Sequence, residues 1–291
     1  MTMLRPKLLA LSLSFAFCLP AEVSILAVTS AASFETGLPP KGSIATIFCR
    51  GLSRVSGVVS ATGVPLPLTL SDVRVTVGGA PAPLFAVASV GANLQQINIQ
   101  VPQEATLVEN QPAEVRVSQD GQEALTKVPR RQSPGDFFRY GGNYGVFQHA
   151  SDYSLVTEAN PAKPGETIIA YLTGMIGTDP TVPTGQPSPA VPLAVVINLS
   201  NFTNTDEYFM VWHPLGSAQI LSSAPQFMGL VPGLAGVYQI NFQLPEGLPL
   251  GLGGLAELDL LRHYCRKLQF SDCRSPATAF FSGRVMIWVG K

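Results

Sequence analysis

Histidine is the first residue type to consider for chemistry, because its side chain binds metals and transfers protons near neutral pH. The chain contains His149, His213 and His263, which are 64 and 50 positions apart (213 − 149, 263 − 213). No H-E-x-x-H or similar ligand motif surrounds any of them. The sequence therefore predicts no metal site and no cofactor.

Cysteine offers a second kind of chemistry. Cys265 and Cys273 flank a short polar stretch, and in an oxidising compartment this spacing predicts a disulfide that closes a hairpin. Cys49 ends an apolar run that begins at Ile44. We interpret Cys49 as a small buried core residue and not as a reactive thiol.

Three aromatic residues form the candidate ligand site. Tyr208, Phe209 and Trp212 lie in the stretch 198–216, and exposed aromatic faces are what sugars stack on. A stacking platform for carbohydrate is one interpretation. The other is that the stretch folds back and buries its rings in a core.

Carboxylates are the remaining candidates for catalysis. The 19 acidic residues include the pair Asp206-Glu207, which we interpret as a solvated turn because a calcium loop needs more oxygen ligands. The sequence has no Gly-x-Ser-x-Gly nucleophile elbow and no Gly-rich phosphate loop opening a helix. We predict no catalytic residues and no enzyme, with a glycan hydrolase built on distant carboxylates as the less favoured alternative.

Composition narrows the classes of partner. Only 13% of the 291 residues are charged, the net charge is −1, and no basic stripe is present. A nucleic-acid-binding protein normally carries such a stripe, so we expect no nucleic-acid partner. A protein or a glycan remains as the partner, and its identity is unknown.

The N-terminus reads as an export signal. Arg5 and Lys7 precede a mostly apolar run, Leu8–Leu19, which is too short to span a bilayer comfortably. We predict a signal peptide at 1–21 and a secreted or cell-surface protein. No later segment contains eighteen uninterrupted apolar residues, so no integral membrane span is expected after signal removal.

The elements that must position these residues occur in two copies. Gln95–Pro102 and Tyr238–Pro245 share Gln, Ile, Asn, Gln and Pro at an offset of 143 positions (239 − 96). Apolar residues occupy every second position, which predicts a strand buried on one face, and the proline ends it. Lys41–Phe48 and Pro164–Tyr171 form a second pair, at an offset of 123 (164 − 41).

Short alternating strands and regular turn signals predict two tandem antiparallel β-sandwiches. We place the first at 22–130, a linker at 131–147 and the second at 148–291. Five aromatic residues fall in this linker. One interpretation is a ligand platform, and the favoured one is that they pack between the units or begin the second core: Phe137, Phe138, Tyr140, Tyr144 and Phe147.

Several motifs together resemble a known family. They are Ala31–Phe34, Pro65–Pro67, Ala82–Phe85, Asn160–Glu166, Tyr171–Gly174 and Leu230–Asn241. These motifs resemble the Solibacter-type uncharacterised C-terminal domain family of acidobacterial exported proteins. The resemblance implies export and an immunoglobulin-like fold of the TIG type, and it carries over no catalytic residue. The stretch 198–216 is longer than the family's usual turns.

These observations favour a non-catalytic exported β-sandwich module for adhesion, surface structure or protein–protein contact. The alternative is a carbohydrate-binding module that uses the aromatic residues of 198–216.

Overall fold

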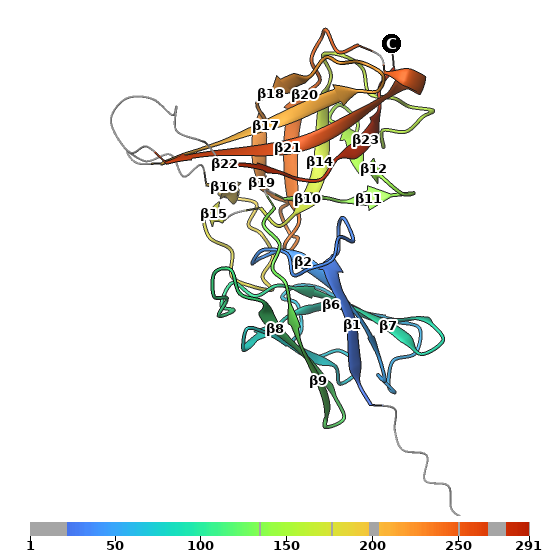
Figure 1. Ribbon diagram of the computed structural model, residues 1–291, viewed down its shortest axis with the longest axis vertical. Helices are drawn as coiled ribbons and strands as arrows, with labels where there is room; N and C mark the ends of the chain where they lie inside the picture. The colour runs from blue at the N-terminus through green and yellow to red at the C-terminus, as the bar shows by residue number, and fades with distance from the viewer. Residues whose placement is uncertain are drawn as a thin grey trace, which may run out of the picture.

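The computed structural model describes residues 22–133, 135–175, 177–197, 204–249, 251–266 and 278–290 (Figure 1). Within these ranges almost every regular element is a strand, and the helical structure is one 3-10 turn, η1 (Leu252–Gly254). The predicted all-β fold is therefore confirmed. The predicted signal peptide, 1–21, lies outside the described residues.

Two antiparallel sheets enclose the first core. The larger has the order β1-β2-β7-β6-β3 and the smaller β5-β4-β8-β9. Apolar side chains from both sheets form one buried cluster, in which Val28 and Ile97 of the larger sheet join Val75 and Val117 of the smaller. This arrangement is a β-sandwich. Its strands are β1 (Ser24–Ser30), β2 (Ile44–Arg50), β3 (Val58–Ser60), β4 (Arg74–Val77), β5 (Ala80–Ala82), β6 (Leu84–Gly91), β7 (Leu94–Gln100), β8 (Ala113–Gln119) and β9 (Gln122–Val128).

Two further sheets enclose a second core. One has the order β10-β14-β20-β19-β16-β15 with β13 also on β14, and the other β11-β12-β23-β21-β17-β18 with β22 also on β21. Ile168 and Phe242 of the first join Trp212 and Leu258 of the second in one buried cluster. The strands are β10 (Asp136–Phe137), β11 (Arg139–Tyr140), β12 (Tyr144–Gly145), β13 (Phe147–His149), β14 (Thr167–Thr173), β15 (Thr178–Asp179), β16 (Val195–Val196), β17 (Asn204–Pro214), β18 (Leu221–Ser223), β19 (Phe227–Leu230), β20 (Tyr238–Gln243), β21 (Leu255–Arg266), β22 (Thr278–Phe281) and β23 (Val285–Trp288).

The sequence repeat is also a repeat of strand pairing. β2 pairs with β7 with Ile47 opposite Ile97, and β14 pairs with β20 with Ala170 opposite Ile240. The two pairs are related by the sequence offsets of 123 and 143 (170 − 47, 240 − 97). The two copies therefore form the same ladder in the same register, and the alternate apolar residues face a core in both.

The polar residues of the repeat have a common role. The Gln96 side-chain amide donates to Asn98 Oδ1 at 3.0 Å, and the Gln239 amide donates to Asn241 Oδ1 at 2.8 Å. Residues two apart in a strand lie on the same face, so this Gln-x-Asn pair joins side chains on the face turned away from the core. The repeated motif therefore specifies the side chains on both faces of the strand: apolar residues face the core, and the Gln-x-Asn pair lies on the opposite face.

The segment predicted as a linker contributes to the second sandwich. Phe137 and Phe147 are fully buried in the second core cluster, and β10 and β13 both pair with β14. The expectation that the aromatic group begins the second core is confirmed for these two rings. The stretch between β9 and β10 is only 129–135, which Figure 1 shows passing between the lower sheets and the upper ones.

Candidate functional site

The three aromatic residues predicted as a sugar platform lie on β17. This strand pairs with β21 along its whole length, so its side chains alternate between the core and the other face of the sheet. Trp212 is 0% exposed and its ring lies 5.4 Å from that of Phe242, while Tyr208 is also buried. Phe209 points the other way and is half-buried. The structure thus places Trp212 and Tyr208 in the core, where they offer no ring face to a sugar.

The predicted disulfide involves Cys273, which lies outside the described residues, and Cys265, whose backbone is part of β21. Cys49 is buried with 0% exposure, as expected of a core residue. Desolvation raises the pKa of its thiol to about 12. A thiol with such a pKa is a poor nucleophile at neutral pH.

His149 has a structural partner on each ring nitrogen. Its Nδ1 lies 2.6 Å from Glu166 Oε1, and its Nε2 lies 3.2 Å from the Asn160 carbonyl oxygen. The other oxygen of Glu166 accepts from the Lys163 backbone N–H. These contacts explain why Asn160 and Glu166 belong to one sequence motif: both hold the loop that leads into β14.

A buried carboxylate lies on the second sandwich. Asp259 is 4% exposed, and its Oδ2 accepts from Arg284 Nε at 3.1 Å and lies 3.4 Å from His213 Nε2. Burial raises the pKa of Asp259, against the opposing effects of Arg284 and His213. Sequence reasoning did not bring these residues together, because the β17–β21 register and the turn before β23 decide their proximity. Among the described residues no group of three or more His, Cys, Asp or Glu could hold a metal ion.

The most distinctive cavity lies where the two sandwiches meet. It has a volume of about 430 Å³, within the range of small-ligand and side-chain pockets. Nine of its ten lining residues are apolar, and the tenth is Asn98. The first sandwich supplies Ala31, Ile44, Val64, Leu66, Phe85 and Asn98, and the second supplies Phe138, Leu234, Ala235 and Val237. We call this space the junction cavity.

Hydrogen bonds between the sandwiches hold the walls of the junction cavity in place. Thr173 Oγ1 accepts from the Ile44 backbone N–H at 2.8 Å and donates to the Gly236 carbonyl oxygen at 2.8 Å. Gln100 donates to the Gly42 carbonyl oxygen and accepts from the Gly185 N–H at 2.6 Å. Two buried polar side chains are thus satisfied across the junction, which fixes one sandwich against the other.

The side-chain oxygen of Asn98 accepts hydrogen bonds from neighbouring residues. Its Oδ1 accepts from both the Thr46 hydroxyl, at 2.9 Å, and the Gln96 amide. The described lining therefore contains no ionisable side chain, and the Oδ1 acceptor of its one polar side chain already has partners. Such a lining suits the binding of apolar groups and offers no general acid or base.

Comparisons with known proteins do not assign the chain to a family. No model of a known protein family matches the chain, and no curated protein matches it. The resemblance drawn from the sequence motifs therefore stays an expectation. Among the described residues, no helix has the length and apolar character needed to cross a bilayer.

The sequence contained only part of the signal for this site. Pro65–Pro67 and Leu230–Gly236 are two of the motifs that carry the family resemblance, and residues of both line the junction cavity. Their convergence could not be predicted, because it depends on how one sandwich is seated on the other.

Proposed function

We propose that the protein is a non-catalytic, exported β-sandwich module for protein–protein contact, and that the junction cavity receives apolar side chains of a partner protein. The observation that carries this proposal is the apolar lining of a cavity of about 430 Å³ between two hydrogen-bonded sandwiches.

The exposure of the cavity walls supports a partner that covers them. Leu234 is 47% exposed and Val64 is 38% exposed, although both face a cavity with apolar walls. Protein interiors are close-packed, so an open apolar cavity is stabilised when another apolar group fills it. Burying one leucine-sized side chain contributes about 1.5–3 kcal/mol.

A protein segment suits this lining better than a sugar. Sugars carry many hydroxyl groups, and each buried hydroxyl without a hydrogen bond costs free energy. Asn98 is the one polar lining side chain, and its acceptor oxygen is already paired with Thr46 and Gln96, so few hydrogen-bonding groups remain for sugar hydroxyls. A peptide can instead insert an apolar side chain and keep its backbone at the rim.

An edge strand next to the cavity favours an extended partner. β3 is the last strand of its sheet, and the chain runs from Ser60 to Val64 at the cavity wall. Val58 on β3 is 70% exposed. Edge strands accept extended peptides by backbone pairing, while neighbouring pockets select the side chains.

Export is part of the proposal and rests on the signal-like residues 1–21. The resemblance of the sequence motifs to a family of exported proteins supports the same location.

The test is a panning experiment on the purified mature protein. A displayed peptide library is selected on the wild type, and the enriched peptides are measured against Leu234→Asp and Leu125→Asp. Leu125 lies on β9, away from the cavity, and is 48% exposed, so it matches Leu234 in residue type and exposure.

We expect enriched peptides with apolar anchors that lose binding to Leu234→Asp and keep it with Leu125→Asp. Equal binding to both variants would refute the junction cavity as the contact site. A glycan array run in parallel decides the alternative, because glycan binding that depends on Leu234 would favour a carbohydrate-binding module.

A further inference from the structure

One face of the second sandwich carries a row of side chains that runs directly across five strands. Tyr140 lies opposite Tyr144, Tyr144 opposite Met286, Met286 opposite Glu257, and Glu257 opposite His213. The strands are β11, β12, β23, β21 and β17, which Figure 1 labels on the upper sandwich. Neighbouring strands lie about 4.8 Å apart, so the four steps span roughly 19 Å. We call these five residues the cross-strand row.

The cross-strand row lies on the face of its sheet that is turned away from the core. Val285 and Ile287 flank Met286 on β23 and are buried in the second core, and so is Trp212, which precedes His213 on β17. Successive residues of a strand point to opposite faces, and directly paired residues point to the same face. The row therefore faces the surface of the molecule.

Aromatic rings form one end of the row. The Tyr144 ring lies 5.9 Å from that of Tyr140 and 5.5 Å from that of Trp288, which is two residues beyond Met286. The Tyr144 and Trp288 rings are nearly parallel, and at this centroid distance they form an offset stack in which they overlap only in part. Tyr140, the outermost ring, is 42% exposed. The sheet that turns Trp212 towards the core thus presents a different set of rings on its other face.

Hydrogen-bonding groups form the other end of the row. Arg284 Nη1 donates to Glu257 Oε2 at 2.8 Å, and Arg284 Nε donates to Asp259 Oδ2 at 3.1 Å. Asp259 is two residues beyond Glu257 on β21, so both carboxylates lie on the face of the row. Arginine has five N–H donors and a carboxylate accepts about four hydrogen bonds, so these groups keep capacity for a ligand.

Two polar atoms at this end are buried without a hydrogen-bond partner in the part of the chain that the structure describes. They are Asp259 Oδ1 and His213 Nε2. Asp259 is 4% exposed, so its side chain is shielded from water. Buried polar atoms in folded proteins nearly always have partners, so this vacancy points to a ligand or an ordered water beside them. A hydroxyl group both donates and accepts, and it would suit the carboxylate and the imidazole alike.

We propose that the cross-strand row, with Trp288, Asp259 and Arg284 beside it, binds a neutral oligosaccharide. Sugar rings have apolar C–H faces that stack on aromatic rings, and hydroxyl groups that hydrogen-bond to carboxylates and arginine. The row offers both kinds of group within a length that accommodates several consecutive sugar rings. An acidic glycan is disfavoured, because the two carboxylates offset the charge of the one guanidinium.

This site goes beyond the contact proposed for the junction cavity. No residue of the row lines that cavity. An apolar peptide, which suits the junction cavity, would cover the polar end of the row without supplying hydrogen bonds, and that costs free energy. The two sites therefore select ligands of different chemistry.

The test is isothermal titration calorimetry of the mature protein with three neutral oligosaccharides: cellohexaose, xylohexaose and mannohexaose. The test variants, Tyr144→Ala and Glu257→Gln, each alter one end of the row. The controls, Tyr153→Ala and Glu109→Gln, make the same changes elsewhere. Tyr153 is 66% exposed, and its carbonyl oxygen accepts from the side chain of Gln148 on β13, which belongs to the other sheet of the sandwich.

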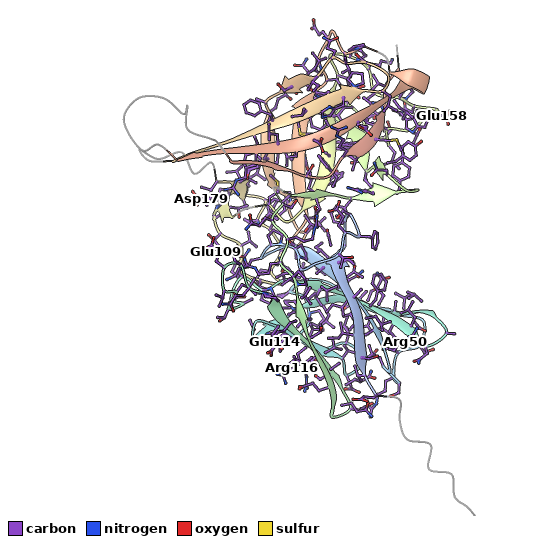
Figure 2. The ribbon with its side chains drawn as sticks, viewed as in Figure 1. Arg50, Glu109, Glu114, Arg116, Glu158 and Asp179 are labelled. Carbon is purple, nitrogen blue, oxygen red and sulfur yellow. The ribbon has the colours of Figure 1, made fainter. Side chains whose placement is uncertain are left out.

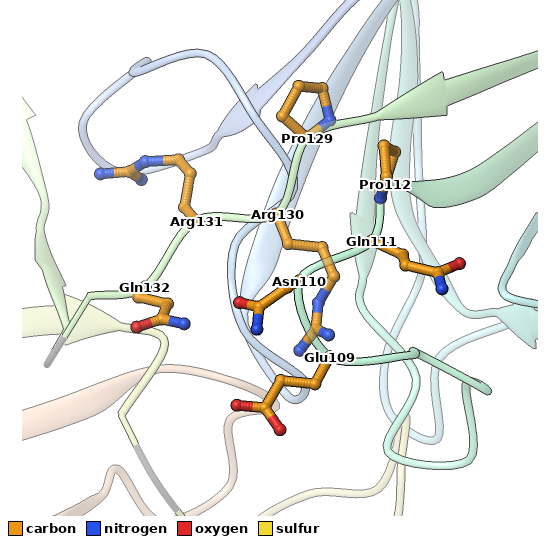
Figure 3. Close-up of a pocket in the computed structure, with 8 residues that line it drawn as sticks. All are labelled: Glu109, Asn110, Gln111, Pro112, Pro129, Arg130, Arg131 and Gln132. Atoms are coloured by element: carbon orange, nitrogen blue, oxygen red, sulfur yellow. The ribbon is translucent and has the colours of Figure 1, made fainter.

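The position of Glu109 makes it a suitable control for the charge of Glu257. Figure 2 places Glu109 below the upper sandwich, and Figure 3 shows it in a separate cavity of about 240 Å³ that Arg130 also lines. No residue of the row lines that cavity. An equal loss of binding in Glu109→Gln and Glu257→Gln would therefore be an effect of net charge, and it would overturn the proposal.

We expect saturable binding of at least one oligosaccharide by the wild type and by both controls. Binding should be weaker by roughly tenfold or more in Glu257→Gln, because a hydrogen bond to a charged group is worth at least a factor of that order. Tyr144→Ala should also bind more weakly, whereas Tyr144→Phe, which keeps the ring, should retain binding. Added salt should change the affinity little, because the ligand is uncharged.

The absence of saturable binding to all three oligosaccharides would overturn the proposal. So would binding that persists in both test variants, or displayed peptides that bind through Tyr144 in place of a sugar. Far-UV circular dichroism checks that each variant remains folded, and Tyr144→Phe separates the loss of the ring from a loss of structure. These outcomes leave the junction cavity untouched, because its test uses peptides and Leu234→Asp.

Discussion

The hydroxyl of Thr173 offers a direct test of how the two sandwiches are joined. It is fully buried, accepts from the Ile44 N–H at 2.8 Å and donates to the Gly236 carbonyl oxygen at 2.8 Å. Thr173→Val keeps the shape of the side chain and removes both hydrogen bonds. The backbone groups of Ile44 and Gly236 would then be buried without partners.

The magnitude follows from those two orphaned groups. Leaving one buried donor or acceptor unsatisfied costs about 1–3 kcal/mol, so the loss of both partners is expected to lower the free energy of unfolding by about 2–6 kcal/mol. The matched control is Thr76→Val on β4, a half-buried position whose hydroxyl has no hydrogen bond to another described residue. We expect that control to lie within about 0.5 kcal/mol of the wild type.

Urea unfolding followed by tryptophan fluorescence measures this effect. Both tryptophans, Trp212 and Trp288, belong to the second sandwich, so their emission reports on the part of the molecule that contains Thr173. Far-UV circular dichroism reports on both sandwiches in the same samples. If Thr173→Val unfolds with the same free energy as Thr76→Val, the contact between the sandwiches is not formed as described and the reasoning fails.

Two further predictions concern titration and reactivity. Burial raises the pKa of Asp259 above its ordinary value of 3.8, so between these two pKa values the folded state binds more protons than the unfolded state. Stability is therefore expected to fall as the pH rises through that window, and Asp259→Asn should flatten this slope in unfolding curves measured at a series of pH values. An unchanged slope would remove Asp259 as its source. Cys49, with a pKa of about 12 and no exposure, should resist alkylation by iodoacetamide in native buffer and react once urea unfolds the protein, as followed by mass spectrometry. Rapid labelling in native buffer would contradict its burial.

Much of the local structure was predictable because it depends on periodicity and turn chemistry. Val73, Val75 and Val77 alternate with polar residues, a pattern typical of a strand, and β4 covers the last two with their side chains buried. Asp-Gly is a typical two-residue hairpin turn, and Asp120 and Gly121 both adopt positive φ between β8 and β9, as such a turn requires.

The candidate sites were much less predictable. The rings of Tyr208 and Trp212 suggested a platform, yet the pairing of β17 with β21 turns both towards the core. Tyr144, Met286 and Glu257 are far apart in the sequence, and only the pairing of β12, β23 and β21 places them in one row. Periodicity predicts which face of a strand is buried. It does not predict which other sheet packs on that face, or which chain segment packs against the end of a sandwich.

By itself the sequence determined the strands, their turns and the shared register of the two copies, because these depend on residues close together in the chain. The tertiary structure decided whether equivalent positions of the two copies are buried or exposed. Arg50 and Thr173 occupy the same place at the ends of β2 and β14 (173 − 50 = 123). Arg50 is exposed, whereas Thr173 is buried against Ile44, because the end of β14 packs on the beginning of β2 and no second copy packs on the end of β2 within the described chain.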